Sequence, residues 1–377
     1  MKIKRLGRDA KSTKIMRELG VDGSGIKIMA KKAEVMLFYI TNMHVGAANI
    51  LKQDALSVGA DLAIPNGTIT CAFKRVDALL IGTKKHIEIL AKKELAQPYG
   101  LKELAKELRT YLKREEFAPK IMGIINATED SFYPKSRFSP KEAIAAIEQM
   151  VSEGADIIDI GGMSTRPGSE EISEEEELKR VAPIIDTLAK KTFGVRLSID
   201  TYRPKVARYA LERGFDILND ITGLENDELA QIAAEYGAGV VIMHKKGDPK
   251  TMQQNPQYTD VVAQVSDFFK ERIHKAKAFG VQEIILDPGI GFGKRLEDNL
   301  VLLRDLVEYK KFGYEILVGA SRKSMIDKII PTPVQERLPG TLSLHQLALQ
   351  NGATIVRCHD VAAHKQLIEI YKAYERV

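Results

Sequence analysis

Four polar residues of three chemical types each follow a separate apolar run in this sequence: Asp200, Asn219, Asp287 and Lys323. Two carboxylates, an amide and an amine together can match the hydrogen-bond donors and acceptors along the edge of a flat heterocycle. The structural alternative is that the two aspartates only cap the helices that follow them, and the Pro-Gly after Asp287 does have the composition of a turn. Four such residues at four run ends are harder to explain as caps, so the pattern favours a binding site for a planar, polar ligand.

A second set of residues is suited to anions. Arg357 and His359 are two residues apart at the end of an apolar run, so both side chains should lie on one side of a strand. The fork of an arginine matches phosphate oxygens. The segment 319–324, Gly-Ala-Ser-Arg-Lys-Ser, predicts the start of a helix, whose free N–H groups bind anions. Each feature alone is equally consistent with a structural ion pair; together they predict an anionic substrate with two separated negative ends.

Two long polar segments, 126–134 and 161–168, follow the first two apolar runs. Loops of this kind can close over a substrate and exclude water. Asn126 offers a neutral side-chain oxygen, which suits a Mg²⁺ ion held mainly by phosphate and water. The sequence contains no carboxylate-rich segment of the calcium-binding type. We therefore expect Mg²⁺ to be bound mostly by a phosphorylated substrate and to contact the protein at Asn126.

The apolar runs that precede these residues recur about every thirty residues from position 120 onward, and a helix-like stretch follows each of them. Eight such units are typical of a (β/α)8 TIM barrel, in which all strand ends, and the active site, lie on one face. We therefore predict that the polar residues named above meet at one end of a barrel. The expected strands are 121–125, 157–160, 197–199, 217–218, 240–243, 284–286, 316–318 and 355–356, and a closing helix is expected at 362–374.

The chain has 377 residues, whereas a single barrel needs about 250, so a second domain is expected. We predict a smaller α/β domain over residues 1–116 and the barrel over residues 117–377. The smaller domain shows no catalytic cluster, and the lone His44 and Cys71 are expected to be structural. Its expected strands are 26–29, 35–39, 60–64 and 78–81, and its expected helices are 45–56, 84–96 and 101–113. The predicted fold class is therefore α/β: a (β/α)8 TIM barrel preceded by a smaller α/β domain.

Composition excludes several classes of protein. No run of eighteen apolar residues occurs, so no membrane span is expected, and the basic N-terminus lacks the apolar core of a secretory signal. The two cysteines, Cys71 and Cys358, have no metal-type spacing, which favours a reducing cytoplasm and argues against zinc. Residues 1–116 carry 22 Lys+Arg and 13 Asp+Glu, a net +9, within a chain of net charge +5. A basic domain can meet nucleic acid, but a solvated lysine-rich surface is the simpler interpretation.

The motifs of residues 117–377 are similar to those of the dihydropteroate synthase family, whose members share a pterin-binding TIM barrel. Eight motifs occur in the family's order, which makes the resemblance specific. The first 116 residues fall outside the family core. The matching segments are 122–132 (MGIINATEDSF), 158–168 (IDIGGMSTRPG), 198–204 (SIDTYRP), 219–221 (NDI), 243–244 (MH), 286–294 (LDPGIGFGK), 321–324 (SRKS) and 356–361 (VRCHDV).

This resemblance implies that 4-aminobenzoate is joined to 6-hydroxymethyl-7,8-dihydropterin diphosphate, with release of pyrophosphate, by a magnesium-dependent cytoplasmic homodimer. It implies catalytic roles for Asp200, Lys323, Arg357 and His359. The pterin site would comprise Asp200, Asn219, Ile221, Met243, Asp287, Phe292 and Lys323. The diphosphate site would comprise Asn126, also the metal contact, with Arg166, Arg357 and His359. The aminobenzoate site would comprise Phe132, Thr165, Pro167, Phe292 and Ser324. Asp159 would orient the second loop.

No protein nucleophile is needed for such a reaction, because the pterin ring can stabilise a cation once pyrophosphate leaves. The enzyme would then act by positioning and by stabilising the leaving group. Asp200, close to the ring, is expected to stabilise the positive charge that develops.

The sequence departs from the family pattern in its loops. Glu129 replaces a proline, Tyr133 follows the phenylalanine of the first loop, Met163 stands where glutamate is usual, and Lys245-Lys246 replaces Met-Gln. These changes leave room for a different arylamine acceptor. Two other classes remain open: a pterin-dependent methyltransferase, which would lack the Ser-Thr-Arg-Pro-Gly loop and the Arg–His pair, and a non-catalytic pterin-binding or regulatory protein.

Overall fold

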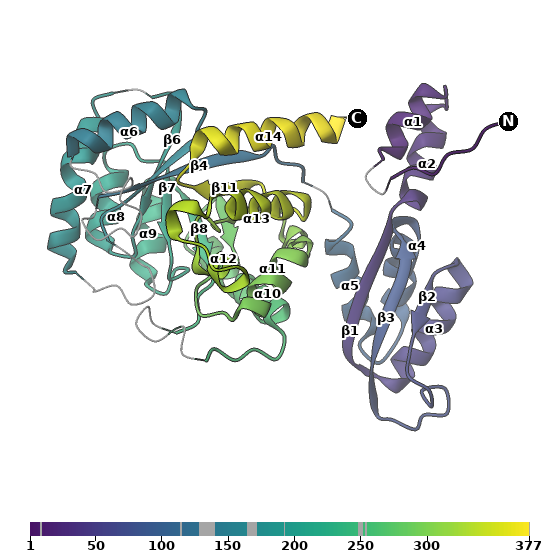
Figure 1. The fold of residues 1–377 in the computed structure, drawn as a ribbon. Helices are drawn as coiled ribbons and strands as arrows, with labels where there is room; N and C mark the ends of the chain where they lie inside the picture. The colour runs from purple at the N-terminus through teal and green to yellow at the C-terminus, as the bar shows by residue number, and fades with distance from the viewer. Residues whose placement is uncertain are drawn as a thin grey trace. The chain divides into compact units, whose positions relative to one another are not determined.

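Eight parallel strands form a closed barrel in the part of the chain that the computed structural model describes, in the order β10-β11-β4-β5-β6-β7-β8-β9 (Figure 1). The structure describes residues 1–7, 10–113, 115–127, 140–163, 172–191, 193–247, 252 and 255–376. The chain divides into two units, Met1–Arg114 with Glu375–Val377, and Glu115–Tyr374. The predicted TIM barrel is thereby confirmed in the larger unit.

The barrel strands alternate with helices along the chain. The strands are β4 (Lys120–Asn126), β5 (Ile157–Gly161), β6 (Arg196–Asp200), β7 (Ile217–Asp220), β8 (Gly239–Met243), β9 (Ile284–Asp287), β10 (Glu315–Val318) and β11 (Ile355–Cys358). The α-helices are α6 (Pro140–Ser152), α7 (Glu174–Leu188), α8 (Pro204–Leu211), α9 (Asp227–Glu235), α10 (Val261–Ala278), α11 (Leu296–Arg304), α12 (Ser324–Ile329), α13 (Leu338–Gln350) and α14 (Val361–Arg376). Short 3₁₀ turns lie at η3 (Leu306–Phe312) and η4 (Val334–Glu336).

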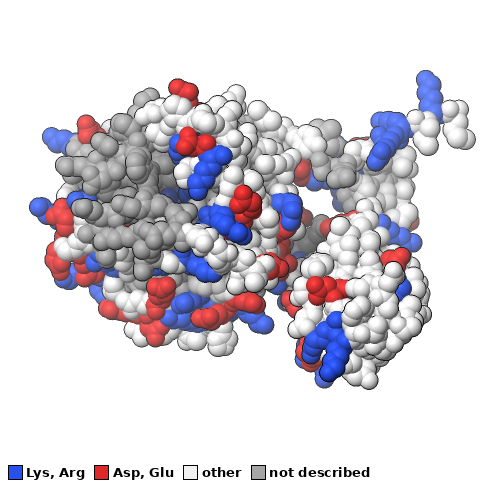
Figure 2. Space-filling view, turned by 60° about the horizontal axis from the view of Figure 1, so that its bottom comes forward, with Lys and Arg blue, Asp and Glu red and all other residues white. Residues whose placement is uncertain are grey.

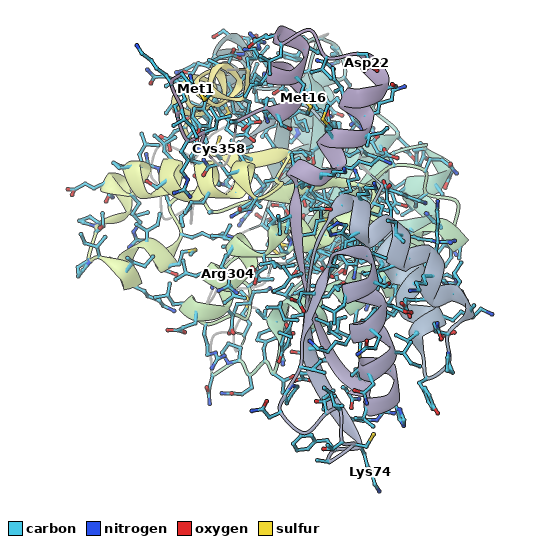
Figure 3. All side chains as sticks on the ribbon, turned by 90° about the vertical axis from the view of Figure 1, so that its right-hand side faces the viewer. Met1, Met16, Asp22, Lys74, Arg304 and Cys358 are labelled. Atoms are coloured by element: carbon cyan, nitrogen blue, oxygen red, sulfur yellow. The ribbon has the colours of Figure 1, made fainter. Side chains whose placement is uncertain are left out.

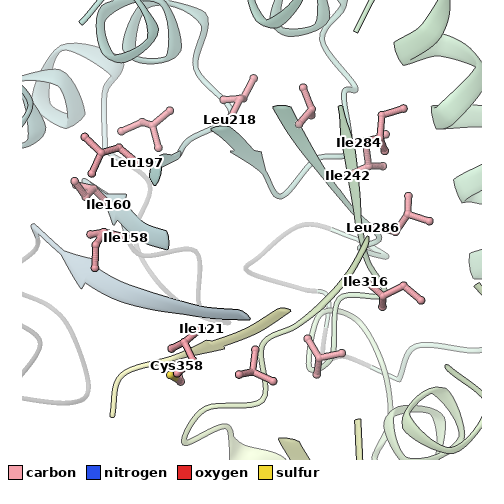
Figure 4. Packing of buried hydrophobic residues seen from close by; sticks show 14 of the residues in the cluster. Ile121, Ile158, Ile160, Leu197, Leu218, Ile242, Ile284, Leu286, Ile316 and Cys358 are labelled. Carbon is pink, nitrogen blue, oxygen red and sulfur yellow. The ribbon is translucent and has the colours of Figure 1, made fainter. Parts of the chain in front are cut away.

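Alternation along the strands builds two apolar layers. Successive strand residues point to opposite faces, so Ile121 joins the core between strands and helices while Met122 joins a separate buried cluster inside the barrel. Figure 4 shows the outer layer, with Ile158, Leu218 and Ile316 among the side chains surrounding the ring of strands. The inner cluster comprises Met122, Ile157, Ile217, Val241, Ile285, Leu317 and Ile355. Burying one such side chain contributes about 1.5–3 kcal/mol, so these layers fix the strand ends that carry the polar residues.

The smaller unit contains a three-stranded antiparallel sheet in the order β1-β3-β2. Its strands are β1 (Val35–His44), β2 (Asp61–Ala63) and β3 (Arg75–Thr83), and its helices are α1 (Ser12–Glu18), α2 (Gly23–Ala33), α3 (Val45–Val58), α4 (Lys84–Lys93), the 3₁₀ turn η1 (Glu94–Ala96) and α5 (Leu101–Thr110). Figure 3 shows Asp22, before α2, and Lys74, before β3, at opposite ends of this unit.

One expected element of the smaller unit is wrong. The strand predicted at 26–29 is part of helix α2, whose start is capped by the Asp22 carboxylate as it accepts hydrogen bonds from the N–H groups of Ser24 and Gly25. A four-residue apolar run does not distinguish strand from helix by itself. His44 has a structural role, because its Nδ1 accepts a hydrogen bond from the Gly46 N–H, 3.1 Å away, at the start of α3.

The helices, the surface charges and the cysteines can be compared with what the composition predicts. Among the described residues, no helix combines the length and the apolar character needed to cross a membrane. Over the barrel unit, basic and acidic side chains are interspersed on the face in Figure 2. Cys71 is exposed and Cys358 is buried, and both are free thiols.

Candidate active site

A cavity of about 460 Å³ opens where the carboxyl ends of the barrel strands meet. This volume lies in the range typical of small-molecule sites. Eleven predicted residues line the cavity: Asn126, Asp200, Asn219, Ile221, Met243, Asp287, Phe292, Lys323, Ser324, Arg357 and His359. The remaining four predicted residues, Phe132, Thr165, Arg166 and Pro167, lie outside the described residues.

The floor of this cavity combines polar and apolar groups from the ends of four strands. Asp200, Asn219 and Asp287 are buried at the ends of β6, β7 and β9. Lys323 follows β10, and its ammonium lies 4.5 Å from the ring centroid of Phe292, a cation–π contact. It also donates to the Ile290 carbonyl. The predicted grouping of two carboxylates, an amide and an amine beside an aromatic ring is therefore present in the structure.

Asp159 connects several residues of this floor. Its fully buried carboxylate accepts hydrogen bonds from the Ser198 hydroxyl at 2.6 Å, the Asn219 amide at 2.9 Å and Nε of Arg357 at 2.6 Å. Residues 164–168 of the second loop, which Asp159 is expected to orient, lie outside the described residues. Within the described part of the chain, Asp159 holds Arg357 and Asn219 in place.

Arg357 joins two carboxylates. Its Nη2 donates to Oδ2 of Asp200 at 2.7 Å, while its Nε is bonded to Asp159. The sequence motif predicts phosphate binding but gives no sign of this double ion pair. Nη1 forms no hydrogen bond within the described residues, so the guanidinium can fix the floor and still offer a donor to an anion.

Burial raises the pKa of Asp200 to about 7, against the opposing effect of Arg357, and the nearby Asp159 adds to the increase. Oδ1 of Asp200 is buried and has no hydrogen-bond partner among the described residues. Burial also raises the pKa of Asp287, whereas Lys323 acts in the opposite direction. A buried acceptor of this kind requires a donor, and the N–H groups of a bound heterocycle would supply one.

Lys294 is a supporting residue that sequence reasoning missed. Its fully buried ammonium donates to the carbonyls of Gly289 at 2.9 Å and of His244 and Phe292 at 3.1 Å. Burial lowers its pKa to about 7, although Asp287 opposes this effect. These bonds fold the segment after β9 into a fixed loop that presents Phe292 to the cavity.

The loop after β10 is also tightly held. Arg322 has a left-handed backbone, with φ of 54°, and forms a two-bond ion pair with Asp360 at 2.8 and 2.9 Å. Ser321 lines the cavity, and its hydroxyl lies 2.9 Å from Nδ1 of His359. Neither Ser321 nor Arg322 was given a role from sequence, although both lie in the 321–324 motif that could have indicated one.

Arg337 is a further unpredicted residue of the cavity wall. It donates to the Thr332 carbonyl at 2.8 Å and the Arg322 carbonyl at 3.3 Å, and it lies 3.3 Å from Asp327. No motif in the sequence marks it.

Met163, which stands where the family usually has glutamate, is buried in the wall, with the Tyr202 hydroxyl 3.8 Å from its sulfur.

A resident metal cage is absent from the described residues, which contain no group of three or more His, Cys, Asp or Glu side chains suited to hold a metal ion. Asn126 lies at the end of β4 and offers a neutral oxygen to the cavity. Asp200, a strand-end carboxylate that also lines the cavity, is engaged by Arg357. This donor set fits a Mg²⁺ ion held largely by a substrate diphosphate and water.

Comparisons with known proteins agree with this geometry. A family model described as "Pterin binding enzyme" matches residues 122–359. The bifunctional dihydropteroate synthase/dihydropteroate reductase of Helicobacter pylori is 40% identical over 380 residues, which cover 100% of this chain and 99% of that protein. The dihydropteroate synthase of Synechocystis is 45% identical over 261 residues, covering 68% of this chain and 90% of that protein. The crystal structure of the Yersinia pestis dihydropteroate synthase with a sulfonamide drug complex superposes with a TM-score of 0.67 at 39% identity, covering 69% of this chain and 95% of that chain.

Proposed function

The chain belongs to the dihydropteroate synthase family of pterin binding enzymes, and on this premise we propose how its residues divide the work of the reaction. The enzyme is a transferase that condenses 6-hydroxymethyl-7,8-dihydropterin diphosphate with 4-aminobenzoate in folate biosynthesis. A C–O bond breaks with its electron pair leaving on pyrophosphate. The arylamine nitrogen then forms the new C–N bond and loses a proton. The observation that carries the assignment is the polar floor at the strand ends.

The pterin ring binds on this floor. Oδ1 of Asp200 and the carboxylate of Asp287 accept from the ring's N–H groups, while Asn219 and Lys323 complete the match to its edge. Ile221, Met243 and Phe292 supply the apolar contacts with its faces. Asp200 faces the developing cation as a carboxylate, and such preorganised charge lowers the barrier.

The diphosphate end is served by Arg357 and His359, with Asn126 contributing an oxygen. Nη1 of Arg357 suits a phosphate oxygen because its other two nitrogens are already fixed by carboxylates. When bound, Mg²⁺ neutralises charge on the diphosphate and makes it a better leaving group. Arg166 is proposed to join this end from the second loop.

4-Aminobenzoate is proposed to lie at the outer end of the cavity, between Phe292 and the first-loop Phe132, with its carboxylate facing Ser324. Thr165 and Pro167 would complete this part of the site. A carboxylated ring suits a part of the cavity wall that carries the basic side chain of Arg337. Because several loop residues differ from the family pattern, the identity of the arylamine acceptor has to be determined by experiment.

The direct test is release of pyrophosphate from the pterin diphosphate, measured with and without 4-aminobenzoate. We expect release that depends on both substrates. A methyltransferase would release no pyrophosphate, and a regulatory protein would bind the pterin without turnover. Either result would overturn the proposed reaction.

Mg²⁺ is expected to bind weakly to the free protein and tightly in the presence of pyrophosphate, because the diphosphate supplies most of its ligands. Calorimetric titration of Mg²⁺ with and without pyrophosphate measures both affinities. Asn126→Ala should weaken the second affinity more than the first. Tight binding of Mg²⁺ to the protein alone would contradict the proposal.

We also propose a second candidate activity, reduction of dihydropteroate, for which the full-length match to the Helicobacter pylori protein is the support. That match includes the first 116 residues, which the family model does not cover. Reduction requires a hydride donor, of the reduced nicotinamide or flavin class. To test for this activity, the protein is incubated with dihydropteroate and each hydride donor in turn, and the loss of dihydropteroate is monitored by chromatography.

Deletion of residues 1–114 separates the two activities. We expect the remaining barrel to keep transferase activity, because all residues proposed for that reaction lie in the larger unit, and to lose any reductase activity. A truncated protein that melts cooperatively but transfers no pterin would show that the smaller unit contributes to the transferase site.

We propose that the enzyme works as a homodimer in the cytoplasm. The free thiols Cys71 and Cys358 suit a reducing compartment. Exposed apolar side chains on α13 and α14, Leu347 and Ile370, suit a contact between two copies. Light scattering of the purified protein and of Leu347→Lys distinguishes a dimer from a monomer.

A further inference from the structure

Two buried histidines, His345 on α13 and His364 on α14, lie behind the diphosphate end of the site rather than in it. Both side chains are fully buried. Nε2 of His345 accepts a hydrogen bond from the Ala320 N–H at 3.0 Å. Nδ1 of His345 lies 2.8 Å from Nε2 of His364, and Nδ1 of His364 lies 2.7 Å from the Asp360 carbonyl. The chain of bonds therefore runs from the loop after β10 to the loop after β11.

The groups at the two ends of this series of hydrogen bonds determine which atom donates in each bond. A backbone N–H can only donate, so Nε2 of His345 must accept, and its proton must lie on Nδ1. A carbonyl can only accept, so Nδ1 of His364 must carry a proton. The remaining bond then runs from Nδ1–H of His345 to Nε2 of His364, and all donors and acceptors are satisfied with both rings neutral. Burial lowers the pKa of each ring, although Asp360 acts in the opposite direction on His364.

The face of α13 that carries His345 also binds the loop after β10 at a second residue. Thr341, one turn before His345 on α13, accepts a hydrogen bond from the Arg322 N–H at 2.9 Å. Two N–H groups on either side of Ser321 are thus bound by one helix. Ser321 in turn contacts His359 through its hydroxyl, which lies 2.9 Å from Nδ1 and 3.3 Å from the backbone nitrogen.

We propose that His345 and His364 are positioning residues for the diphosphate end of the site: a pair of neutral imidazoles with fixed tautomers that locks together the two loops carrying Ser321 and His359. This inference rests on the proposed function, because it assigns His359 to the diphosphate. Among the described residues, neither ring hydrogen-bonds to Asp200, Asn219 or Asp287, and Lys323 is the one floor residue in a loop that the pair holds. Loss of the pair should therefore weaken pyrophosphate binding more than the binding of free pterin, whereas simple loss of core packing would weaken both alike.

The kinetic test compares three variants of the full-length protein. His345→Leu removes the acceptor for the Ala320 N–H, and His345→Gln retains both an acceptor and a donor. His274→Leu, an exposed histidine on α10, is the matched control. For the leucine variant at 345 we expect about tenfold weaker binding of pyrophosphate with Mg²⁺ and a similar fall in kcat/KM for the pterin diphosphate, as displaced supporting groups typically cause. Free pterin should lose clearly less affinity than pyrophosphate does, the glutamine variant should recover most of the loss, and the control should show none.

A spectroscopic test needs no activity. In ¹⁵N-histidine-labelled protein, both rings should show the neutral tautomer with the proton on Nδ1, whereas a neutral histidine in water prefers Nε2. A proton on Nε2 of either ring, or a charged ring at pH 7, would overturn the proposal, as would equal losses of pyrophosphate and free pterin binding in His345→Leu. If wild type releases no pyrophosphate, the proposed function fails, yet the tautomers and the pyrophosphate affinity still decide whether the pair acts as proposed.

Discussion

Replacing Arg357 by alanine is expected to lower the free energy of unfolding by about 3–5 kcal/mol, the usual cost of leaving a buried charge without its partner. The reason is the double ion pair: Asp159 is fully buried and Asp200 nearly so, and both are bound to the one guanidinium. Its removal should also raise the pKa of Asp200 further, because Arg357 is the charge that opposes burial there.

Activity should fall with stability in Arg357→Ala. We expect kcat/KM to drop by about 10²–10³, the loss seen when one preorganised donor to a leaving group or oxyanion is removed. Denaturant unfolding and steady-state kinetics measure the two effects. Arg196→Ala is the matched control: that arginine pairs with Glu283, and their side chains are 34% and 41% exposed, so its loss should cost no more than about 1 kcal/mol. Similar small losses for both variants would show that Arg357 is not the central charge of the floor.

Gly289→Ala is expected to be strongly disruptive for a single methyl addition in the loop after β9. Gly289 has φ of 67°, and an added Cβ would overlap the backbone carbonyl oxygen of His244, which cannot rotate away. A left-handed alanine costs roughly 1–2 kcal/mol by itself. The collision should bring the total to about 4 kcal/mol or more, and displacement of Phe292 should weaken pterin binding.

Gly313→Ala provides the control for backbone conformation alone. Gly313 has φ of 76°, and an added Cβ would meet nothing within 4 Å, so only the left-handed cost of about 1–2 kcal/mol is expected. Chemical denaturation of both variants gives the comparison. Equal destabilisation would mean that the loop around Gly289 adapts readily, contrary to the fixed position that Lys294 gives it.

The strand-end residues could be predicted because their position in sequence determines their position in space. Once apolar runs alternate with helices, residues such as Asn219 and Asp287 must lie at one end of a barrel. Chemical type then indicates the ligand. The short helix α2 could not be distinguished in the same way, since its apolar segment is brief and the Asp22 cap was the signal that would have identified it.

Partnerships between distant residues could not be predicted. Arg357 lies 198 positions from Asp159, and no periodicity links them. Lys294 donates to backbone carbonyls, which every residue carries, so the sequence offers no complementary side chain to recognise. His345 binds the Ala320 N–H and the ring of His364, and no motif links those two histidines in the sequence. Lys294 and His345 are both buried polar residues, and the cost of removing them from water must be offset by hydrogen bonds. This principle can be applied only after burial is known.

The double ion pair of Arg357 has a consequence for inhibitors. Compounds that bind the proposed pterin floor would contact Asp200 and Asn219, which are bonded to Arg357 and Asp159. A single substitution that weakened such a compound would also unpair a buried charge or amide, so resistance there would carry a loss of stability. Compounds that mimic the arylamine would instead depend, under the proposed function, on positions such as the exposed Ser324, where substitution costs the fold little. Selection for resistance to inhibitors should therefore favour substitutions at the aminobenzoate end of the site over substitutions in the floor.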